Sequence, residues 1–170
     1  MLLSELARAL GDELLEIRGD CEIASMSMDN RKFKNLDRGL FFCVPGARFD
    51  GHDFAPQAVE NGAVALVVTH FLDLKVPQLL VKKVRPAMSL MAAEFFGHPE
   101  REMKLLGVTG TKGKTTTSYL IKAIMEEAGY KVGLIGTTGN MIGQQYIKSE
   151  FTTPEPIDFF RTCASCGTRA

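Results

Sequence analysis

Hydrophobic positions in the first half of the chain change between helical and strand-like spacing. Leu3, Leu6, Leu10 and Leu14 recur at helical spacing, which predicts an amphipathic N-terminal helix. Short apolar runs bounded by glycine or proline follow, as is typical of buried strands. These runs lie at 23–28, 40–44, 63–68 and 78–81, and a short helical pattern at 53–62 separates the second run from the third. Helices alternating with strands predict an α/β fold.

A longer amphipathic pattern begins at Pro86, a residue type that favours the first turn of a helix. Gly97 and Pro99 are stop signals, so this helix is expected to end near Phe96. Its apolar face is interpreted as core and contains Met88, Met91, Ala92, Phe95 and Phe96. The segment 98–104 is the best candidate for a linker. We expect two domains, at 1–85 and 86–170.

The segment 105–140 has the pattern of a strand, a glycine-rich loop and a helix in succession. A strand is expected at 105–109, a loop at 110–114, a helix at 115–128 and a second strand at 132–136. The residues expected to face inward from this helix are Leu120, Ile121, Ile124 and Ala128. The arrangement predicts the beginning of a βαβ domain.

The loop between this strand and helix carries the residue types that bind phosphate. Gly110 and Gly113 allow successive backbone N–H groups to point into one concavity, beside the positive end of the helix dipole. Lys114 is placed to reach the terminal phosphate oxygens of a nucleotide, and the Thr115 hydroxyl to ligate Mg²⁺. The sequence therefore predicts a phosphate-binding loop.

The spacing of this loop departs from the standard nucleotide motifs. The phosphate-loop pattern G-x-x-x-x-G-K-[ST] requires glycine at Val108, whereas the nearest glycines are Gly107 and Gly110. The dinucleotide pattern G-x-G-x-x-G is absent, which argues against a dehydrogenase. An NTPase switch would need an acidic magnesium-binding strand, which we do not find. A plain glycine turn with a solvated Lys114 is the structural alternative.

Composition restricts the function classes further. Of the 170 residues, 45% are hydrophobic and 24% charged, which is typical of a globular protein. Lys and Arg number 20, as do Asp and Glu, so no overall field favours nucleic acid or an anionic membrane. The longest apolar run, 62–68, is far shorter than the roughly 20 residues that cross a bilayer, so no membrane insertion is expected. We therefore expect a cytoplasmic protein. We also expect reduced thiols, because the lone C-x-x-C of Cys163 and Cys166 is weak support for a zinc or redox site.

Several segments together resemble one enzyme family. The stretch GVTGTKGKTTT resembles the ATP loop of the Mur ligases of bacterial cell-wall synthesis, whose usual form is G-T-N-G-K-T-[ST]. Lys112 replaces the common Asn and adds a cation beside the phosphates. The segment 29–68 is similar to the N-terminal domain of the family, and GLIGTTGN followed by SEFTTPEP looks like the branch that forms the UDP-muramoyl-tripeptide. The resemblance covers residues 2–160.

The resemblance implies residues for ATP and for the substrate. The ATP-binding residues would be Gly110, Thr111, Lys112, Gly113, Lys114, Thr115 and Thr116. Of these, Lys114 and Thr115 would be catalytic, and Thr115 would ligate Mg²⁺. The substrate contacts of the family fall on Met28, Asn30, Ala47, Arg48, Phe49, Thr152 and Thr153. The usual D-S-R of the family is D-N-R here. For Asp29 and Arg31, a structural ion pair is about as well supported as a role in binding the ligand. His52 is interpreted as structural or solvated.

The activity implied by the resemblance is ATP-dependent amide formation. The carboxylate of UDP-N-acetylmuramoyl-dipeptide takes the γ-phosphoryl group, and the amine of diaminopimelate or lysine then displaces the phosphate. The implied fold is a small α/β domain for the UDP end, followed by the first βαβ part of a P-loop (Rossmann-like) ATP-binding domain that we expect to be truncated. The alternatives are a non-catalytic nucleotide or UDP-sugar-binding module and the tripeptide-adding branch of the same family.

Overall fold

The computed structural model describes residues 1–46, 48–147 and 154–167. It divides into two compact units, residues 1–95 and 96–170. The division falls after the helix α3 (Val84–Phe95), whereas the sequence placed it before this helix. The reason is that α3 buries Met88 and Met91 completely and packs on the N-terminal helix of the first unit.

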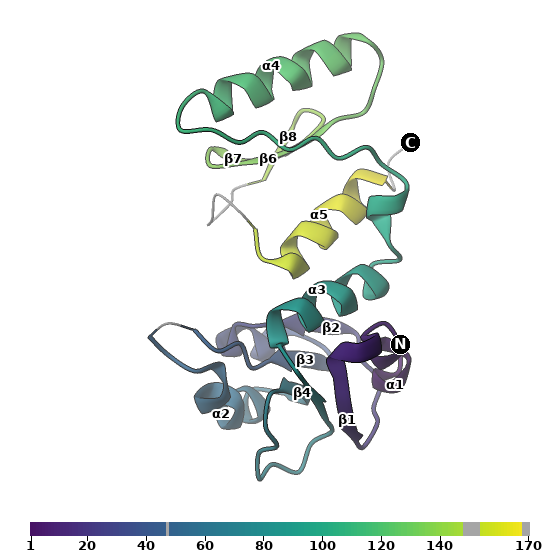
Figure 1. Cartoon of the computed structure of the whole chain (residues 1–170), viewed down its shortest axis with the longest axis vertical. Coiled ribbons are helices and arrows are strands. Elements are labelled where there is room, and N and C mark those ends of the chain that lie inside the picture. Colours follow the sequence, from purple (N-terminus) through teal and green to yellow (C-terminus); the bar gives the residue numbers. More distant parts are fainter. Residues whose placement is uncertain (47, 148–153, 168–170) are drawn as a thin grey trace. The chain divides into compact units, whose positions relative to one another are not determined.

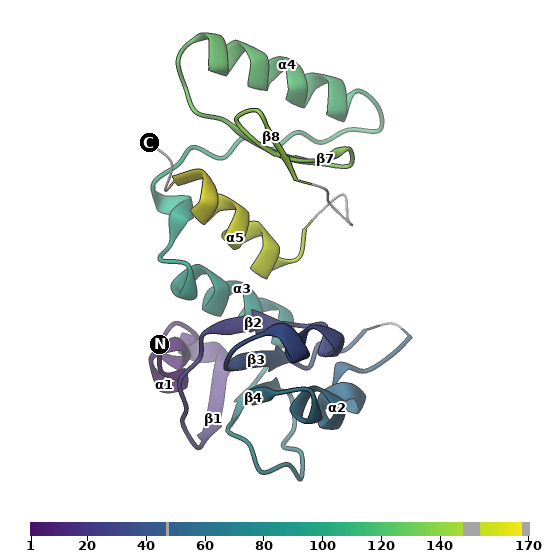
Figure 2. The same cartoon turned by 180° about the vertical axis from the view of Figure 1, so that it is seen from behind.

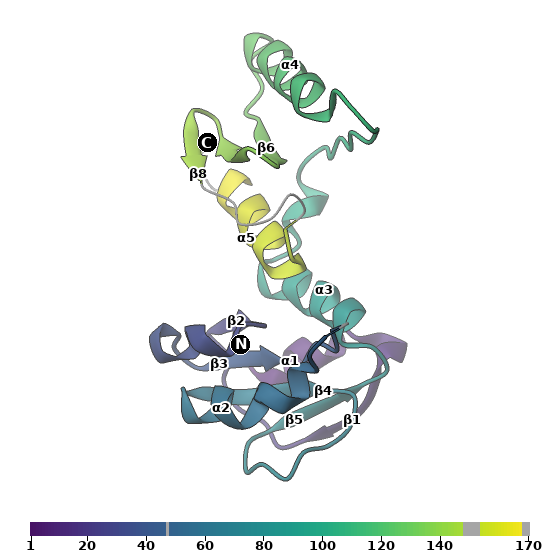
Figure 3. The same ribbon diagram turned by 90° about the vertical axis from the view of Figure 1, so that its left-hand side faces the viewer.

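The first unit is a five-stranded sheet with helices on both faces. Its helices are α1 (Leu3–Arg8), α2 (Ala55–Glu60) and α3, and its short 3₁₀ turns are η1 (Gly11–Glu13), η2 (Asn30–Asn35) and η3 (Gly51–Phe54). Its strands are β1 (Leu14–Arg18), β2 (Ser25–Ser27), β3 (Gly39–Phe42), β4 (Ala63–Val68) and β5 (Gln78–Val81), in the order β1-β5-β4-β3-β2 (Figure 1; β5 is labelled in Figure 3). Neighbours from β2 to β5 are parallel, and β1 is antiparallel to β5. The predicted α/β fold is confirmed in this unit.

Strands β3 and β4 are buried along both faces, which explains why their apolar runs do not alternate with polar residues. Phe41, Leu66 and Val68 belong to one buried cluster with Ala58 of α2. Helix α3 lies across the sheet from α2 (Figure 3). Because successive side chains of a strand point to opposite faces, the buried Phe42 points away from the cluster that contains Phe41.

The N-terminal helix is shorter than predicted. It ends at Arg8, and Leu14 begins the edge strand β1. Gly11 interrupts the helix because it has φ +50°, a left-handed conformation that glycine adopts without a steric cost. The expectation that helical spacing extends to Leu14 was wrong.

The second unit contains helices beside a small antiparallel ribbon. Its elements are η4 (Pro99–Arg101), α4 (Lys114–Glu127), β6 (Gly133–Gly136), β7 (Gly139–Ile142), β8 (Gln145–Ile147) and α5 (Pro156–Gly167). The strands form a meander in the order β6-β7-β8, and α4 packs on β6 (Figure 1). The helix predicted at 115–128 and the strand predicted at 132–136 are confirmed within one residue at each end.

The strand predicted at 105–109 is not formed. Residues 102–113 run from η4 to α4 without regular structure (Figure 2). Leu105 and Leu106 are 56% and 69% exposed, and no described strand pairs with them. Since β6 pairs with β7 and not with this segment, the predicted βαβ unit was wrong for the described residues. A parallel strand is stable when neighbours satisfy its backbone and layers cover both faces, and neither condition holds here.

Helix α4 faces the ribbon with charged side chains. Lys122 is 5% exposed and its Nζ donates to Glu126 Oε1 at 2.6 Å, while Gln144 Nε2 donates to Glu126 Oε2 at 3.5 Å. Leu120 and Ile124 are 59% and 66% exposed. The prediction that these two residues face inward was therefore wrong, and the side of α4 that contacts the turn after β7 carries the ion pair instead.

Candidate functional site

The first group of predicted residues lies at the carboxyl edge of the parallel strands. Strand β2 ends at Ser27, β3 at Phe42 and β4 at Val68, in parallel register. The segments that follow these strands therefore emerge at the same edge of the sheet. In open α/β sheets this edge is where ligands bind.

The segment after β2 is fixed by an ion pair and an amide contact. Asp29 caps η2 by accepting from the Arg31 backbone N–H at 3.0 Å, and it also accepts from Arg31 Nε at 2.9 Å and Nη2 at 2.8 Å. The Arg31 hydrogen bond holds the pKa of Asp29 below its ordinary value. Of the two roles left open for this pair, the structure shows the ion pair.

The side chain of Asn30 joins this segment to α2. Its Nδ2 donates to Gln57 Oε1 at 2.5 Å, and Asn61 Nδ2 donates to the Asn30 carbonyl at 3.0 Å. Met28 and Asn30 are both half-buried. The sequence did not indicate the contact of Asn30 with Gln57, because the two residues lie 27 positions apart and no motif marks Gln57.

The segment after β3 forms a closed loop with an exposed tip. Its base is closed by a bridge between Pro45 and Asp50, and the tip by a hydrogen bond from Gly46 N to Phe49 O at 2.9 Å. Arg48 is exposed, and Phe49 is 70% exposed with its ring edge-on to Phe54 at 6.3 Å. The structure therefore places the predicted Arg48 and Phe49 at the same edge as Met28 and Asn30. The predicted Ala47, Thr152 and Thr153 lie outside the described residues.

The predicted phosphate loop lies in the second unit, before α4. Gly110 has φ +151° and Gly113, the N-cap of α4, has φ +79°. The first amides of α4, beginning at Lys114, have no carbonyl partner within the helix. Lys114 Nζ folds back over the loop and donates to the Gly110 carbonyl at 2.6 Å.

These residues fit the phosphates of a nucleotide. The two glycines leave the backbone open, since a Cβ at Gly113 would meet nothing within 4 Å and one at Gly110 would meet only the Lys112 carbonyl, at 3.6 Å. Lys112 and Thr115 are exposed beside them, so two cations, a hydroxyl and helix-start amides lie in one short segment. The segment has the chemistry for a phosphate site, but no sheet supports it from the N-terminal side in the described residues.

The four cysteines are free thiols. Burial raises the pKa of Cys43 to about 12 and that of Cys163 to about 11. Because the thiolate is the reactive and metal-binding form, neither thiol is prepared for catalysis. The described residues also contain no group of three or more His, Cys, Asp or Glu that could hold a metal ion.

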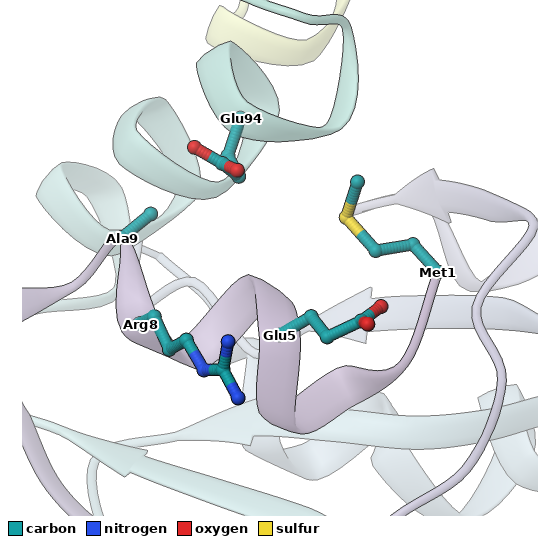
Figure 4. Close-up of a pocket in the computed structure, with 5 residues that line it drawn as sticks. All are labelled: Met1, Glu5, Arg8, Ala9 and Glu94. Atoms are coloured by element: carbon teal, nitrogen blue, oxygen red, sulfur yellow. The ribbon is translucent and has the colours of Figure 1, made fainter.

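An open hollow of about 440 Å³ lies between α1 and α3. Its lining residues are Met1, Glu5, Arg8, Ala9 and Glu94 (Figure 4). Glu5 Oε2 already accepts from the Leu2 backbone N–H at 2.8 Å, so it serves the start of α1. None of the predicted binding residues lines this hollow, and we assign it no function.

Two domain profiles match the chain. The profile described as "Mur ligase family, catalytic domain" matches residues 22–96, and the one described as "Mur ligase middle domain" matches residues 108–169. Together they take up well over half of the chain. The chain belongs to the Mur ligase family.

Curated relatives of this Mur ligase chain are much longer. The UDP-N-acetylmuramoyl-L-alanyl-D-glutamate--2,6-diaminopimelate ligase 1 of Clostridium acetobutylicum is 46% identical over 160 residues, which cover 91% of this chain and 33% of the relative. The corresponding ligase of Syntrophomonas wolfei is 42% identical over 168 residues, which cover 98% of this chain and 34% of the relative. The chain thus spans about a third of the length of these relatives.

Solved structures agree with the fold of this Mur ligase chain. A UDP-N-acetylmuramoyl-L-alanyl-D-glutamate--2,6-diaminopimelate ligase matches with a TM-score of 0.64 and 22% identity, over 86% of this chain and 30% of that one. A MurF from Acinetobacter baumannii matches with a TM-score of 0.57 and 27% identity, over 73% of this chain and 27% of that one. In the part of the chain that the structure describes, no helix has the length and apolar character needed for a bilayer crossing.

Proposed function

We propose that the chain is part of an ATP-dependent ligase that joins 2,6-diaminopimelate to UDP-N-acetylmuramoyl-L-alanyl-D-glutamate. The observation that carries this proposal is its 46% identity, over 160 residues, to a protein of that name. Lysine was the other amino acid left open by the sequence, and the names of the relatives favour diaminopimelate. We place the reaction in the cytoplasm, because it uses ATP and the cysteines are free thiols.

The proposed site for the UDP end is the carboxyl edge of β2 and β3. Arg48 offers a guanidinium without a protein partner among the described residues, and this group matches the oxygens of a diphosphate. Phe49 offers an exposed ring, and Asn30 retains its Oδ1 as an acceptor because only its Nδ2 is engaged by Gln57. Met28 and Ala47 complete this set, and Thr152 and Thr153 are proposed to contact the muramoyl-peptide.

The proposed site for ATP is the loop from Gly110 to Thr116. When bound, MgATP supplies the phosphoryl group that activates the substrate carboxylate. The amides of the loop and the ammonium groups of Lys112 and Lys114 orient the phosphates and neutralise their charge, and the Thr115 hydroxyl holds Mg²⁺. Lys114 Nζ, which contacts the Gly110 carbonyl here, would be within reach of the phosphate oxygens.

A non-catalytic UDP-sugar-binding module is the second candidate. One observation favours it: the UDP loops are built on a completed sheet, whereas the strand predicted before the phosphate loop is not formed. The two candidates share the UDP site and differ in whether MgATP binds.

The UDP site is tested by replacing Arg48 with alanine. We expect the affinity for UDP to fall about 10- to 100-fold, because hydrogen bonds to a charged group contribute about 1.5–3 kcal/mol. Uridine, which lacks the diphosphate, should bind both proteins equally. The measurement is calorimetric titration of each ligand into wild type and R48A.

The matched control is R8A, which removes an exposed arginine from α1, outside the proposed site. This variant should bind UDP as the wild type does. Equal UDP affinities for wild type and R48A would remove Arg48 from the site, and no UDP binding by folded wild type would remove the site itself.

A further inference from the structure

His52 is a buried side chain that makes a hydrogen bond through each of its two ring nitrogens. It is 4% exposed and lies in η3, directly after the loop that carries Arg48 and Phe49. Its Nε2 lies 3.0 Å from the backbone nitrogen of Thr69, and its Nδ1 lies 2.5 Å from Asp50 Oδ1. A backbone N–H can only donate, so Nε2 accepts and is unprotonated. The ring proton is therefore on Nδ1 and is donated to Asp50.

This ring connects two different strand ends. Asp50 closes the loop after β3, and Thr69 is the first residue after β4. The Thr69 hydroxyl is also 3.3 Å from Nε2, and the ring of His70 stacks on that of His52 at 4.3 Å with an interplanar angle of 19°. His52 is thus held from three sides at the edge where the proposed UDP site lies.

The other contacts at the base of the loop act within the loop itself. Gly51 N donates to the Val44 carbonyl at 3.0 Å, and a Cβ at Gly51 would lie 2.4 Å from Val44 N. Asp50 Oδ1 accepts from the His52 backbone N–H at 2.9 Å, and this bond, followed by the one from the ring, holds the pKa of Asp50 below its ordinary value. Asp50 is consequently a carboxylate at neutral pH. The His52 ring connects this carboxylate to Thr69 at the end of β4.

We propose that His52 is a positioning residue: by tying Asp50 to the end of β4, it holds the loop that presents Arg48 and Phe49 to the diphosphate of a UDP-linked substrate. The inference rests on the proposed function, because it assumes that UDP binds at this edge. It assigns His52 no contact with the ligand. Its effect on binding must therefore pass through the side chains that the loop presents, and of these Arg48 carries the charge that matches the diphosphate.

A double-mutant cycle tests this route. Replacing His52 with glutamine keeps a polar side chain but removes the link between Asp50 and Thr69. UDP affinity should then fall about tenfold, because a misplaced loop loses most of the contact between Arg48 and the diphosphate. In the R48A background the same change should have less than a twofold effect, because the contact that it positions is already gone. An effect of H52Q that is equal in both backgrounds would overturn the proposal, as would an unchanged UDP affinity in H52Q.

Loss of stability is separated from loss of positioning by a control variant. Leu6→Ala opens the core beneath α1, where Leu6 is fully buried, and does not touch the loop. At a temperature where urea titration shows both variants folded, L6A should keep the UDP affinity of the wild type within twofold. Equal losses in L6A and H52Q would assign His52 a structural role only and contradict the proposal.

Two further measurements keep the proposal testable if H52Q does not fold. D50N retains an acceptor for the His52 backbone N–H but loses the charge that the ring proton faces, and it should weaken UDP binding several-fold, again only when Arg48 is present. Nitrogen-15 NMR of the wild type, with the ring signals assigned to individual histidines, should show His52 protonated at Nδ1 and not at Nε2. The opposite tautomer would overturn the proposal. No UDP binding by wild type with this tautomer present would contradict the proposed function, and with it the inference.

Discussion

Replacing Lys114 with alanine is expected to weaken MgATP binding by about 10- to 100-fold, because it removes one charge-assisted contact of about 1.5–3 kcal/mol. Lys114 is the first residue of α4, and its ammonium lies over the loop at 2.6 Å from the Gly110 carbonyl. The side chain therefore already reaches across the segment where the phosphates are proposed to bind. The measurement is calorimetric titration of MgATP into wild type and K114A.

The matched control for this change is Lys104→Ala. Lys104 is exposed and precedes the loop in the same unit, so its removal changes the net charge equally without touching the proposed phosphate contacts. K104A should bind MgATP as wild type does. If K114A and K104A both keep the wild-type affinity, the loop does not hold the nucleotide through this lysine.

Replacing Phe41 with alanine is expected to lower the free energy of unfolding of the first unit by about 3–5 kcal/mol. Phe41 is 1% exposed, and its ring meets that of Phe33 edge-on at 5.6 Å in the cluster beneath α2. Truncation removes the ring from β3 and leaves a cavity between the sheet and α2. Because domains are stable by only about 5–15 kcal/mol, this is a large part of the total.

The measurement for F41A is urea unfolding followed by NMR signals of residues 1–95, so that the second unit does not contribute. Leu15→Ala is the control, because Leu15 is 55% exposed on the edge strand β1 and should change the unfolding free energy by about 0.5 kcal/mol or less. A loss in F41A no larger than that in L15A would mean that the cluster under α2 does not stabilise the unit.

The parts of the fold that follow from local pattern could be predicted from sequence. The runs at 40–44 and 63–68 are apolar without alternation, and only strands covered on both faces need such runs. Pro45 and Gly46 end the strand before Arg48, which predicts a loop there, and the structure shows one. The residues proposed for the UDP end came from the family resemblance and not from this pattern. The structure adds that Met28 and Asn30 lie at the same edge as Arg48, because parallel strands bring their carboxyl ends together.

Other parts depend on partners that the local sequence does not show. The segment 105–109 has a strand-like sequence, but a strand also needs neighbours, and none of the described strands pairs with it. Helix α4 has apolar positions at the expected spacing, yet the Lys122–Glu126 pair and not Leu120 faces the ribbon. His52 was interpreted as structural or solvated, and the structure shows it buried. Its contact with Thr69 was not predicted, because the two residues lie 17 positions apart.

We propose above all that this chain holds the UDP end of a muramoyl-dipeptide at the carboxyl edge of its five-stranded sheet. The most direct test is calorimetric titration of UDP-N-acetylmuramoyl-L-alanyl-D-glutamate into the wild-type chain, with and without excess UDP. We expect saturable binding at one site, and we expect UDP to compete with it. No heat of binding from a sample whose NMR spectrum shows a folded first unit, or binding that UDP leaves unchanged, would contradict this claim.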